Sequence, residues 1–320
     1  MSTFRCEDWR DASAERVAPL YAAEVNRWAS LLEWDAAASF EQVEQGRRLG
    51  HVRGVLAVTD KGTIAGWSFY LADERRLQIG GFVASSEACS EAMLSAIFGS
   101  EAASTAATTM FFAYSDAPGL AAALRKRGQT VDRYFYLARD LTVAIRYPLR
   151  DARRWSVADT LAATELMRRA YPESDAARPF APRGALSEWI DYVTQLTAGG
   201  GCGDLVAEAS VSLPLGPDRL SGLALVTRIS PATAHLVQLA IDPSMRRRGL
   251  GSALLLTAFS GAYRCGFRRM TIMVSGKNAV GRRLYEAAGF EVVTSFIAAG
   301  TSQPLRLTSV AGSGVAANLR

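Results

Sequence analysis

The sequence has few of the residues that hold metal ions or form covalent cross-links. Its four cysteines lie far apart, without a Cys-x-x-Cys pair, and only His51 and His235 could supply imidazole ligands. This composition argues against both a zinc site and a disulfide framework. We therefore expect free thiols and no metal.

Long apolar runs are also missing. No stretch of 18 or more residues is free of polar side chains, which argues against a transmembrane helix. The first residues, MSTFRCEDWRDASAERV, carry too many charges for a signal peptide. We expect a cytoplasmic protein without a membrane partner.

Acidic residues are absent from one basic stretch. Residues 244–283 contain nine basic residues and no acidic one, whereas residues 1–150 balance 17 basic against 18 acidic residues. Coding bias explains why 33 of the 36 basic residues are Arg, but it does not explain the missing acids. The local excess predicts a polyanionic partner.

Three patterns recur in the same order, which predicts a duplicated domain. The offsets are 156, 158 and 161 residues, and the second one aligns Val83 with Ile241. The pairs are TIAGWSFYL with RLSGLALVT, LQIGGFVAS with LVQLAIDPS, and LAAALRKRGQTVDRYFYLAR with GRRLYEAAGFEVVTSFIAAG. We expect one domain at 1–143, a second at 144–305 and a frayed tail at 306–320, joined near the proline of YPLRD.

Hydrophobic periodicity in the second copy predicts a mixed α/β layer architecture. Branched apolar runs predict strands, and 3.6-residue spacing predicts helices. The stretches around 199–203 and 214–217 are expected to be loops. The expected helices are 158–171, 251–265 and 278–289, and the expected strands are 204–209, 220–228, 234–241, 269–275 and the closing EVVTSFIAA.

The turn SMRRRGLG, between a strand and a helix, predicts an anion site. The first amides of a helix lack internal partners, and the helix dipole places partial positive charge there. Gly249 and Gly251 would let those amides approach a phosphate closely. A P-loop is excluded because Asn278 follows Gly276-Lys277, and a GxGxxG fingerprint fails at Leu254.

Arg246-x-x-Gly249-x-Gly251 does match [QR]-x-x-G-x-[GA] at every fixed position. With LAIDP before it and NAVGRRLYEAAGF behind it, the turn resembles the acetyl-CoA pyrophosphate loop of the GNAT acyltransferases. The resemblance covers residues 150–300 well and the first copy faintly. It implies two tandem GNAT folds, each a mixed, mostly antiparallel sheet flanked by helices.

The resemblance also implies roles for individual residues. The splayed strand before the loop would meet the pantetheine arm and the thioester carbonyl, and the loop would hold the pyrophosphate. Asn278 would reach the pantetheine, and Tyr285 would lie near the sulfur and act as the acid. The strand and loop residues are Leu239, Ala240, Ile241, Arg246, Arg247, Arg248, Gly249, Leu250, Gly251 and Ser252.

The general base is less well defined. The strand ATAHLVQLAI has no carboxylate, and His235 stands where some tandem relatives carry the base. The alternatives are a solvent-facing histidine at the strand end, Glu208 on the neighbouring strand, or a chain of waters without a single base.

The first copy lacks the cofactor-binding parts. It reads VASSEACSEAML where the loop should be, and Leu124 stands in the place of Tyr285. We expect this degenerate half to be a scaffold or one wall of the acceptor site. The arrangement resembles that of mycothiol synthase, without a signature for that substrate.

Together these features predict an N-acetyltransferase that moves an acetyl group from acetyl-CoA to a primary amine of a small molecule or peptide. Transfer would be direct, because Cys265, the cysteine nearest the loop, is expected to be buried. The alternative is a non-catalytic acyl-CoA-binding regulator. Nucleic-acid binding is disfavoured because no aromatics interleave with the arginines. We expect a monomer or homodimer; the acceptor amine is not encoded in any motif.

Overall fold

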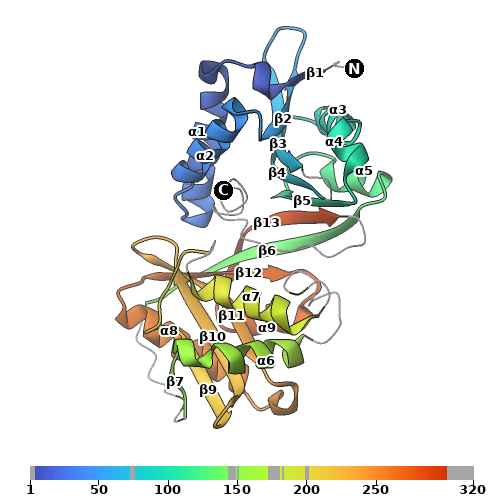
Figure 1. Ribbon diagram of the computed structural model, residues 1–320. Coiled ribbons are helices and arrows are strands. Elements are labelled where there is room, and N and C mark those ends of the chain that lie inside the picture. Colours follow the sequence, from blue (N-terminus) through green and yellow to red (C-terminus); the bar gives the residue numbers. More distant parts are fainter. Residues whose placement is uncertain are drawn as a thin grey trace.

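The computed structural model describes residues 4–72, 76–142, 149, 151–171, 181, 184–198 and 202–300. Helices and strands are distributed over both halves of the chain (Figure 1). The strands are β1 (Arg5–Asp8), β2 (Arg53–Val58), β3 (Ile64–Ala72), β4 (Arg76–Ala84), β5 (Thr108–Tyr114), β6 (Thr130–Asp140), β7 (Arg153–Arg154), β8 (Asp204–Leu205), β9 (Val211–Gly216), β10 (Arg219–Arg228), β11 (Thr233–Ile241), β12 (Arg269–Ser275) and β13 (Glu291–Gly300). The α-helices are α1 (Ala14–Leu32), α2 (Ala37–Arg48), α3 (Glu87–Phe98), α4 (Glu101–Thr105), α5 (Leu120–Lys126), α6 (Thr160–Ala170), α7 (Leu186–Thr197), α8 (Leu250–Arg264) and α9 (Ala279–Ala287), and the 3-10 helices are η1 (Trp9–Asp11), η2 (Val157–Asp159) and η3 (Pro243–Met245).

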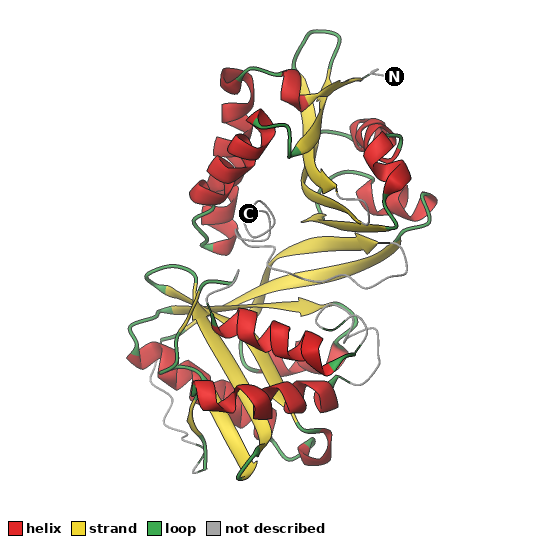
Figure 2. Ribbon diagram, viewed as in Figure 1, coloured by secondary structure: helices red, strands yellow, loops and turns green. Residues whose placement is uncertain are grey.

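One mixed sheet runs through both halves. Its strand order is β1-β2-β3-β4-β5-β13-β6-β12-β11-β10-β9-β7, with β8 paired to β10. Most neighbours are antiparallel, while β4–β5 and β11–β12 are parallel. Helices flank the sheet (Figure 2), so the predicted mixed α/β fold is confirmed.

The last strand of each half lies in the sheet of the other half. β6 closes the first half in sequence but pairs with β12, and β13 closes the second half but pairs with β5. These two strands also pair with each other and cross the centre of the molecule (Figure 1). The predicted boundary at residue 143 remains a prediction, because the expected join and the expected tail lie largely or wholly outside the described residues.

The helices cover opposite faces of the sheet because strand residues alternate between two cores. Val55 and Ala57 pack with α3 and α5, whereas Leu56 and Val58 pack with α1 and α2. The second half repeats this pattern, with α8 and α9 on one face and α6 and α7 on the other. We call the face under α1, α2, α6 and α7 the first face.

Both halves contain a parallel strand pair that opens after a few rungs. β11 pairs with β12 over Thr233–His235 alone, and β4 pairs with β5 over Arg76–Ile79 alone. Each opening strand also carries a register shift against its other neighbour. This shared irregularity agrees with the predicted duplication.

The pairing register corrects one detail of the repeat. Gly66 lies opposite Ala84, and Gly222 lies opposite Ile241. Ala84, rather than Val83, therefore corresponds to Ile241, at an offset of 157. Sequence similarity alone missed this step because both stretches are mostly apolar, so a shift of one residue changes the match little.

The predicted helices of the second half are present to within about two residues at each end, and four of its five strands agree. The strand expected at 204–209 is limited to β8, because the chain turns after Leu205. Pro214, expected in a loop, lies within β9, where a register shift accommodates it. Helix α7 was not predicted.

Candidate active site

The backbone of β11 offers hydrogen-bonding groups to the opening beside β12. The Asp242 amide donates to the Ser221 carbonyl at 2.8 Å. Since hydrogen-bonded pairs alternate along an antiparallel ladder, Leu239 and Ile241 turn their N–H and C=O groups away from β10. Ala240 turns its own groups toward β10 and buries its methyl group under α6 and α7. Of the three predicted strand residues, two are therefore placed to meet a ligand through the backbone.

Eight residues, Asp242–Gly249, connect β11 to α8. Two of them have left-handed backbone, Arg247 at φ 63° and Gly249 at φ 76°. Gly249 is required for this conformation rather than for space, because a Cβ there would meet nothing within 4 Å. Among the described residues, no carbonyl accepts from the amides of Arg247 through Ser252. The loop thus presents a row of free donors at the N-terminus of a 15-residue helix.

Arginines 246 to 248 have different surroundings. Arg246 donates from its guanidinium to the Ala170 carbonyl at the end of α6, at 2.8 Å, and so ties the loop to that helix. Arg247 and Arg248 are exposed and form no ion pair with a carboxylate among the described residues. Their positive charge is available to an anion at the loop.

Asp242 anchors the start of the loop, and sequence reasoning missed it. Its carboxylate accepts from the backbone and hydroxyl of Ser244, and from Arg169 and Arg219 at 3.0 Å each. Burial favours the neutral acid, but these hydrogen bonds outweigh burial and hold the pKa of Asp242 well below its usual range. The LAIDP motif contained the residue but gave no sign of its partners.

Tyr285 lies on α9, which packs beside the first turn of α8. Its neighbour Leu284 lies 3.5 Å from where a Cβ of Gly251 would be, and the Tyr285 ring meets Phe290 edge to face at 5.8 Å. Burial, followed by the nearby Tyr171, raises the pKa of Tyr285 above its ordinary value. The phenol therefore remains protonated at neutral pH.

A buried amide links β11 to two tyrosines on the first face. Gln238 accepts from the Tyr192 hydroxyl at 2.9 Å and donates to the Tyr171 hydroxyl at 2.8 Å. Its register position places it at the opening between β11 and β12. The sequence gave no signal for this network, because glutamine and tyrosine have no distinctive spacing.

His235 lies at the last rung before β11 and β12 separate. It is 6% exposed, so the alternative prediction of a solvent-facing histidine is wrong. Its Nδ1 lies 2.8 Å from the Thr271 hydroxyl, and its ring stacks on Tyr136 and meets the edge of Trp34. Burial lowers the pKa of His235 to about 4, so the imidazole is neutral at pH 7.

Of three other predicted residues, Glu208 and Cys265 have settings different from those expected, whereas Asn278 lies at the start of a helix as predicted. Glu208 is exposed in a turn beside Gly261, roughly 16 Å along α8 from the loop, which removes it as a base. Cys265 is exposed rather than buried, but burial of part of the thiol and the charge of Glu208 raise its pKa, so it is not an activated nucleophile. Asn278 caps α9 by accepting from the Gly281 amide, which leaves its amide nitrogen for a ligand.

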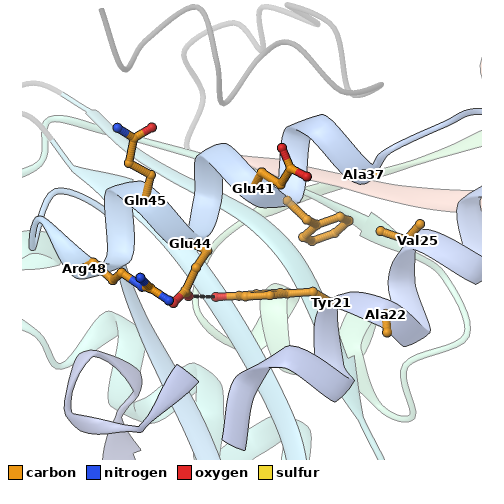
Figure 3. A pocket seen from close by; sticks show the side chains of 9 residues that line it. Tyr21, Ala22, Val25, Ala37, Glu41, Glu44, Gln45 and Arg48 are labelled. Atoms are coloured by element: carbon orange, nitrogen blue, oxygen red, sulfur yellow. Dashed lines mark hydrogen bonds and ion pairs between the residues drawn. The ribbon is translucent and has the colours of Figure 1, made fainter. Parts of the chain in front are cut away.

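A separate hollow of about 450 Å³ lies between α1 and α2 in the first half. Apolar side chains form most of its wall, and Tyr21 points toward Glu44, to which its hydroxyl donates at 3.0 Å (Figure 3). None of the predicted site residues lines this hollow. It is therefore distinct from the opening beside β11.

Within the described ranges, every helix is too short or too polar to span a lipid bilayer. The same ranges contain no group of three or more side chains that could hold a metal ion.

Residues 162–290 match the acetyltransferase (GNAT) family. No curated protein sequence matches the chain. Among solved structures, a GCN5-related N-acetyltransferase from Sphaerobacter thermophilus is 18% identical, covering 96% of this chain and 98% of that one, with a TM-score of 0.61. A glucosamine N-acetyltransferase region of a fungal multi-domain GH3 β-N-acetylglucosaminidase is 13% identical, covering 94% of this chain and 38% of that one, with a TM-score of 0.57. A tandem GNAT protein from the clavulanic acid biosynthesis pathway is 15% identical, covering 78% and 82%, with a TM-score of 0.48.

At these identities the first two solved structures, with TM-scores above 0.5, show a shared fold. The sequence match covers strand β11, the loop Asp242–Gly249 and the helices α8 and α9. Residues 162–290 thus form an acetyltransferase domain of the GNAT family.

Proposed function

We propose that the protein transfers an acetyl group from acetyl-CoA to a primary amine by direct attack within a ternary complex. The observation that carries this proposal is a pair of backbone donor sets on either side of the turn: the outward-facing groups of Leu239 and Ile241, and the amides of Arg247 through Ser252. The loop amides would bind the pyrophosphate, with Arg247 and Arg248 adding charge. Asp242 and Arg246 would hold the loop in its binding conformation.

The oxyanion of the tetrahedral intermediate would be stabilised by the backbone of β11. An N–H group at Leu239 or Ile241 faces the opening before any ligand arrives, so little reorganisation is needed. One donor of this kind typically contributes about 10²–10³ in rate. This backbone supply explains why the strand needs no polar side chain at these positions.

Tyr285 would assist the departure of the CoA thiolate. Its raised pKa makes complete proton transfer to a thiolate unfavourable, since thiols have a pKa of about 8.5. We therefore assign it a hydrogen bond that strengthens as negative charge develops on sulfur. Asn278, at the start of the same helix, would contact the pantetheine.

The amine would lose its proton to water rather than to a side chain. His235 is neutral, but a pKa of about 4 makes its imidazole a poor acceptor from an ammonium group. It lies one rung below the opening and would order water there. The weak base is the one observation that favours the alternative function, a regulator that binds acyl-CoA without turnover.

Calorimetry with acetyl-CoA tests the binding step. We expect saturable binding that weakens when Arg247 and Arg248 are both changed to Ala. No binding at millimolar concentrations would exclude the enzyme and the regulator alike. Thiol release with a panel of amines then separates them, because only an enzyme releases free CoA in an amine-dependent manner.

A Tyr285→Phe variant tests the role of the phenol. We expect kcat to fall by about 100-fold with acetyl-CoA affinity unchanged, because the hydroxyl acts on the leaving group. Tyr263→Phe is the matched control, since Tyr263 lies near the far end of α8, where it packs against Arg268. Normal turnover in Tyr285→Phe would remove Tyr285 from the mechanism.

A further inference from the structure

The end of α1, in the first half, contacts strand β11 of the second half. We call Leu32–Trp34 the α1 corner. Glu33 has left-handed backbone at φ 59°, which is unusual for a residue with a side chain. Such strain persists only where the surroundings hold it, and it often marks a functional contact. The corner points this side chain at the short ladder between β11 and β12.

Glu33 bridges the first rung of that ladder. Thr233 and Arg269 are direct partners across the two strands. One carboxylate oxygen of Glu33 accepts from the Thr233 hydroxyl, and the other lies 2.6 Å from Nε of Arg269. The Arg269 contact is an ion pair, because that N–H is not aligned for a hydrogen bond. A single side chain from the first half thus joins both strands where they begin to pair.

The remaining corner residues surround the third and last rung. His235 and Thr271 are partners there and are linked at 2.8 Å. Trp34 presents its ring to His235 and donates to the Tyr136 hydroxyl at 3.2 Å, and that hydroxyl donates to the Leu32 carbonyl at 2.9 Å. Contacts from the corner therefore bracket the ladder at both ends.

We propose that the α1 corner is a clamp on the apex of the β11–β12 opening, and that Glu33 is a positioning residue for the strand that receives the thioester. The kinetic part of this inference rests on the proposed function. With only three rungs of pairing, the direction in which β11 leaves the sheet depends on those rungs. Leu239 and Ile241 lie four and six residues beyond the apex, so a small rotation there displaces the oxyanion donors. The first half thus acts on the chemistry of the second through the position of β11.

Hydrogen exchange tests the clamp without any substrate. In Glu33→Gly, glycine keeps the left-handed backbone while both links are lost. We expect the rate of amide exchange in the peptide 233–241 to rise by about tenfold or more. Without the two links, the three-rung ladder can open by itself, without the rest of the protein unfolding. Glu33→Gln retains one acceptor oxygen, so its exchange rate in 233–241 should lie between those of Glu33→Gly and the unchanged protein. Thr233→Val removes one link from the other side and should raise exchange in the same peptide.

Asp140→Ala is the matched control. Asp140 also pairs with Arg269, at 2.7 Å, but it lies on β6 and contributes no link to β11. Exchange in 233–241 should match that of the unchanged protein. Equal exchange in Glu33→Gly and Asp140→Ala would overturn the clamp, whatever the activity.

Kinetics then test the consequence for catalysis. We expect Glu33→Gly to lower kcat by about 10- to 100-fold while KM for acetyl-CoA stays within about twofold, because the pyrophosphate loop is unaffected. A raised KM with unchanged kcat would contradict the positioning role. If the unchanged protein transferred no acetyl group, the proposed function would fail, whereas the exchange result would still decide the clamp.

Discussion

The two halves of the molecule share an opened strand pair and differ in the turn that follows it. In the second half, eight residues separate β11 from α8; in the first half, Ser85 and Ser86 alone separate β4 from α3. The amide of Ser85 donates to Ala65 just as that of Asp242 donates to Ser221. The strands are therefore equivalent up to this point, and the loop marks the difference.

The first half also supplies its own negative charge where the second half would take a phosphate. Glu87 lies in the first turn of α3, and its side chain fills the space beside Gly119. A carboxylate there satisfies the helix dipole internally. At the place of Tyr285, α5 carries Leu124, which is fully buried. Both halves thus keep the opened strand pair, and they differ in the few residues of the turn that follows it.

Expressing the first half separately should have the largest effect, a loss of cooperative unfolding. A chain of residues 1–143 would lack β13, which pairs with both β5 and β6. We expect it not to unfold cooperatively, since two strand edges and their apolar faces would be exposed. Thermal unfolding followed by circular dichroism measures this. A cooperative transition like that of the full chain would show that the strand exchange is dispensable.

The two halves should also differ in how their stability depends on pH. The second half carries His235 where the first half, at the offset of 157, carries Gln78, which cannot titrate. The pKa of His235 is about 4 when folded and near 6.5 when unfolded, so the unfolded chain binds more protons between these values. The stability from burying neutral His235 is complete above about pH 6.5 and is lost as pH falls toward 4. At pH 5 the loss is about 2 kcal/mol.

Urea unfolding at pH 5 and pH 7.5 measures that loss by comparison with His235→Phe, which keeps an aromatic ring in the stack. The variant should lose less stability on acidification by about 2 kcal/mol. Equal losses in both proteins would show that His235 does not titrate in this window.

Two glycines with nearly the same backbone test the loop. Gly249 has φ 76° and Gly128 has φ 73°, and a Cβ at either position would meet nothing within 4 Å. Each Gly→Ala change should cost about 1–2 kcal/mol of backbone strain. Only Gly249→Ala should weaken acetyl-CoA binding, by about tenfold, because only it distorts the amides of the loop. Similar affinities for the two variants, measured by calorimetry, would contradict the assignment of the loop.

The smallest effect is expected for Glu87→Gln. Removing the charge takes a favourable interaction from the start of α3, worth about 0.3–1 kcal/mol. Acetyl-CoA stoichiometry should remain one per chain, because the first half still lacks the loop. A second binding event in calorimetry would show that the charge of Glu87 alone prevents the first half from binding acetyl-CoA.

Local features of the sequence predicted much of the second half. The alternation of branched residues located β10, β11 and β12, and the Arg246–Gly249–Gly251 pattern located the loop, because these signals lie within short segments. The failures have a common cause. Glu208 was assigned to a strand that ends at Leu205, and Cys265 was expected in the core, because neither burial nor strand length is determined by neighbours in sequence.

The sequence by itself determined the α/β class, the repeated pattern of strands and the glycine-containing turn after β11, because periodicity and glycine spacing act over a few residues. Only the tertiary structure decided which strands pair, since β6 and β13 have similar apolar patterns and either could close either half. It also decided the setting of His235, whose pKa is lowered by burial and whose ring contacts Trp34 and Tyr136, about 200 and 100 residues away. Long-range packing brings such residues together, and no local pattern records it.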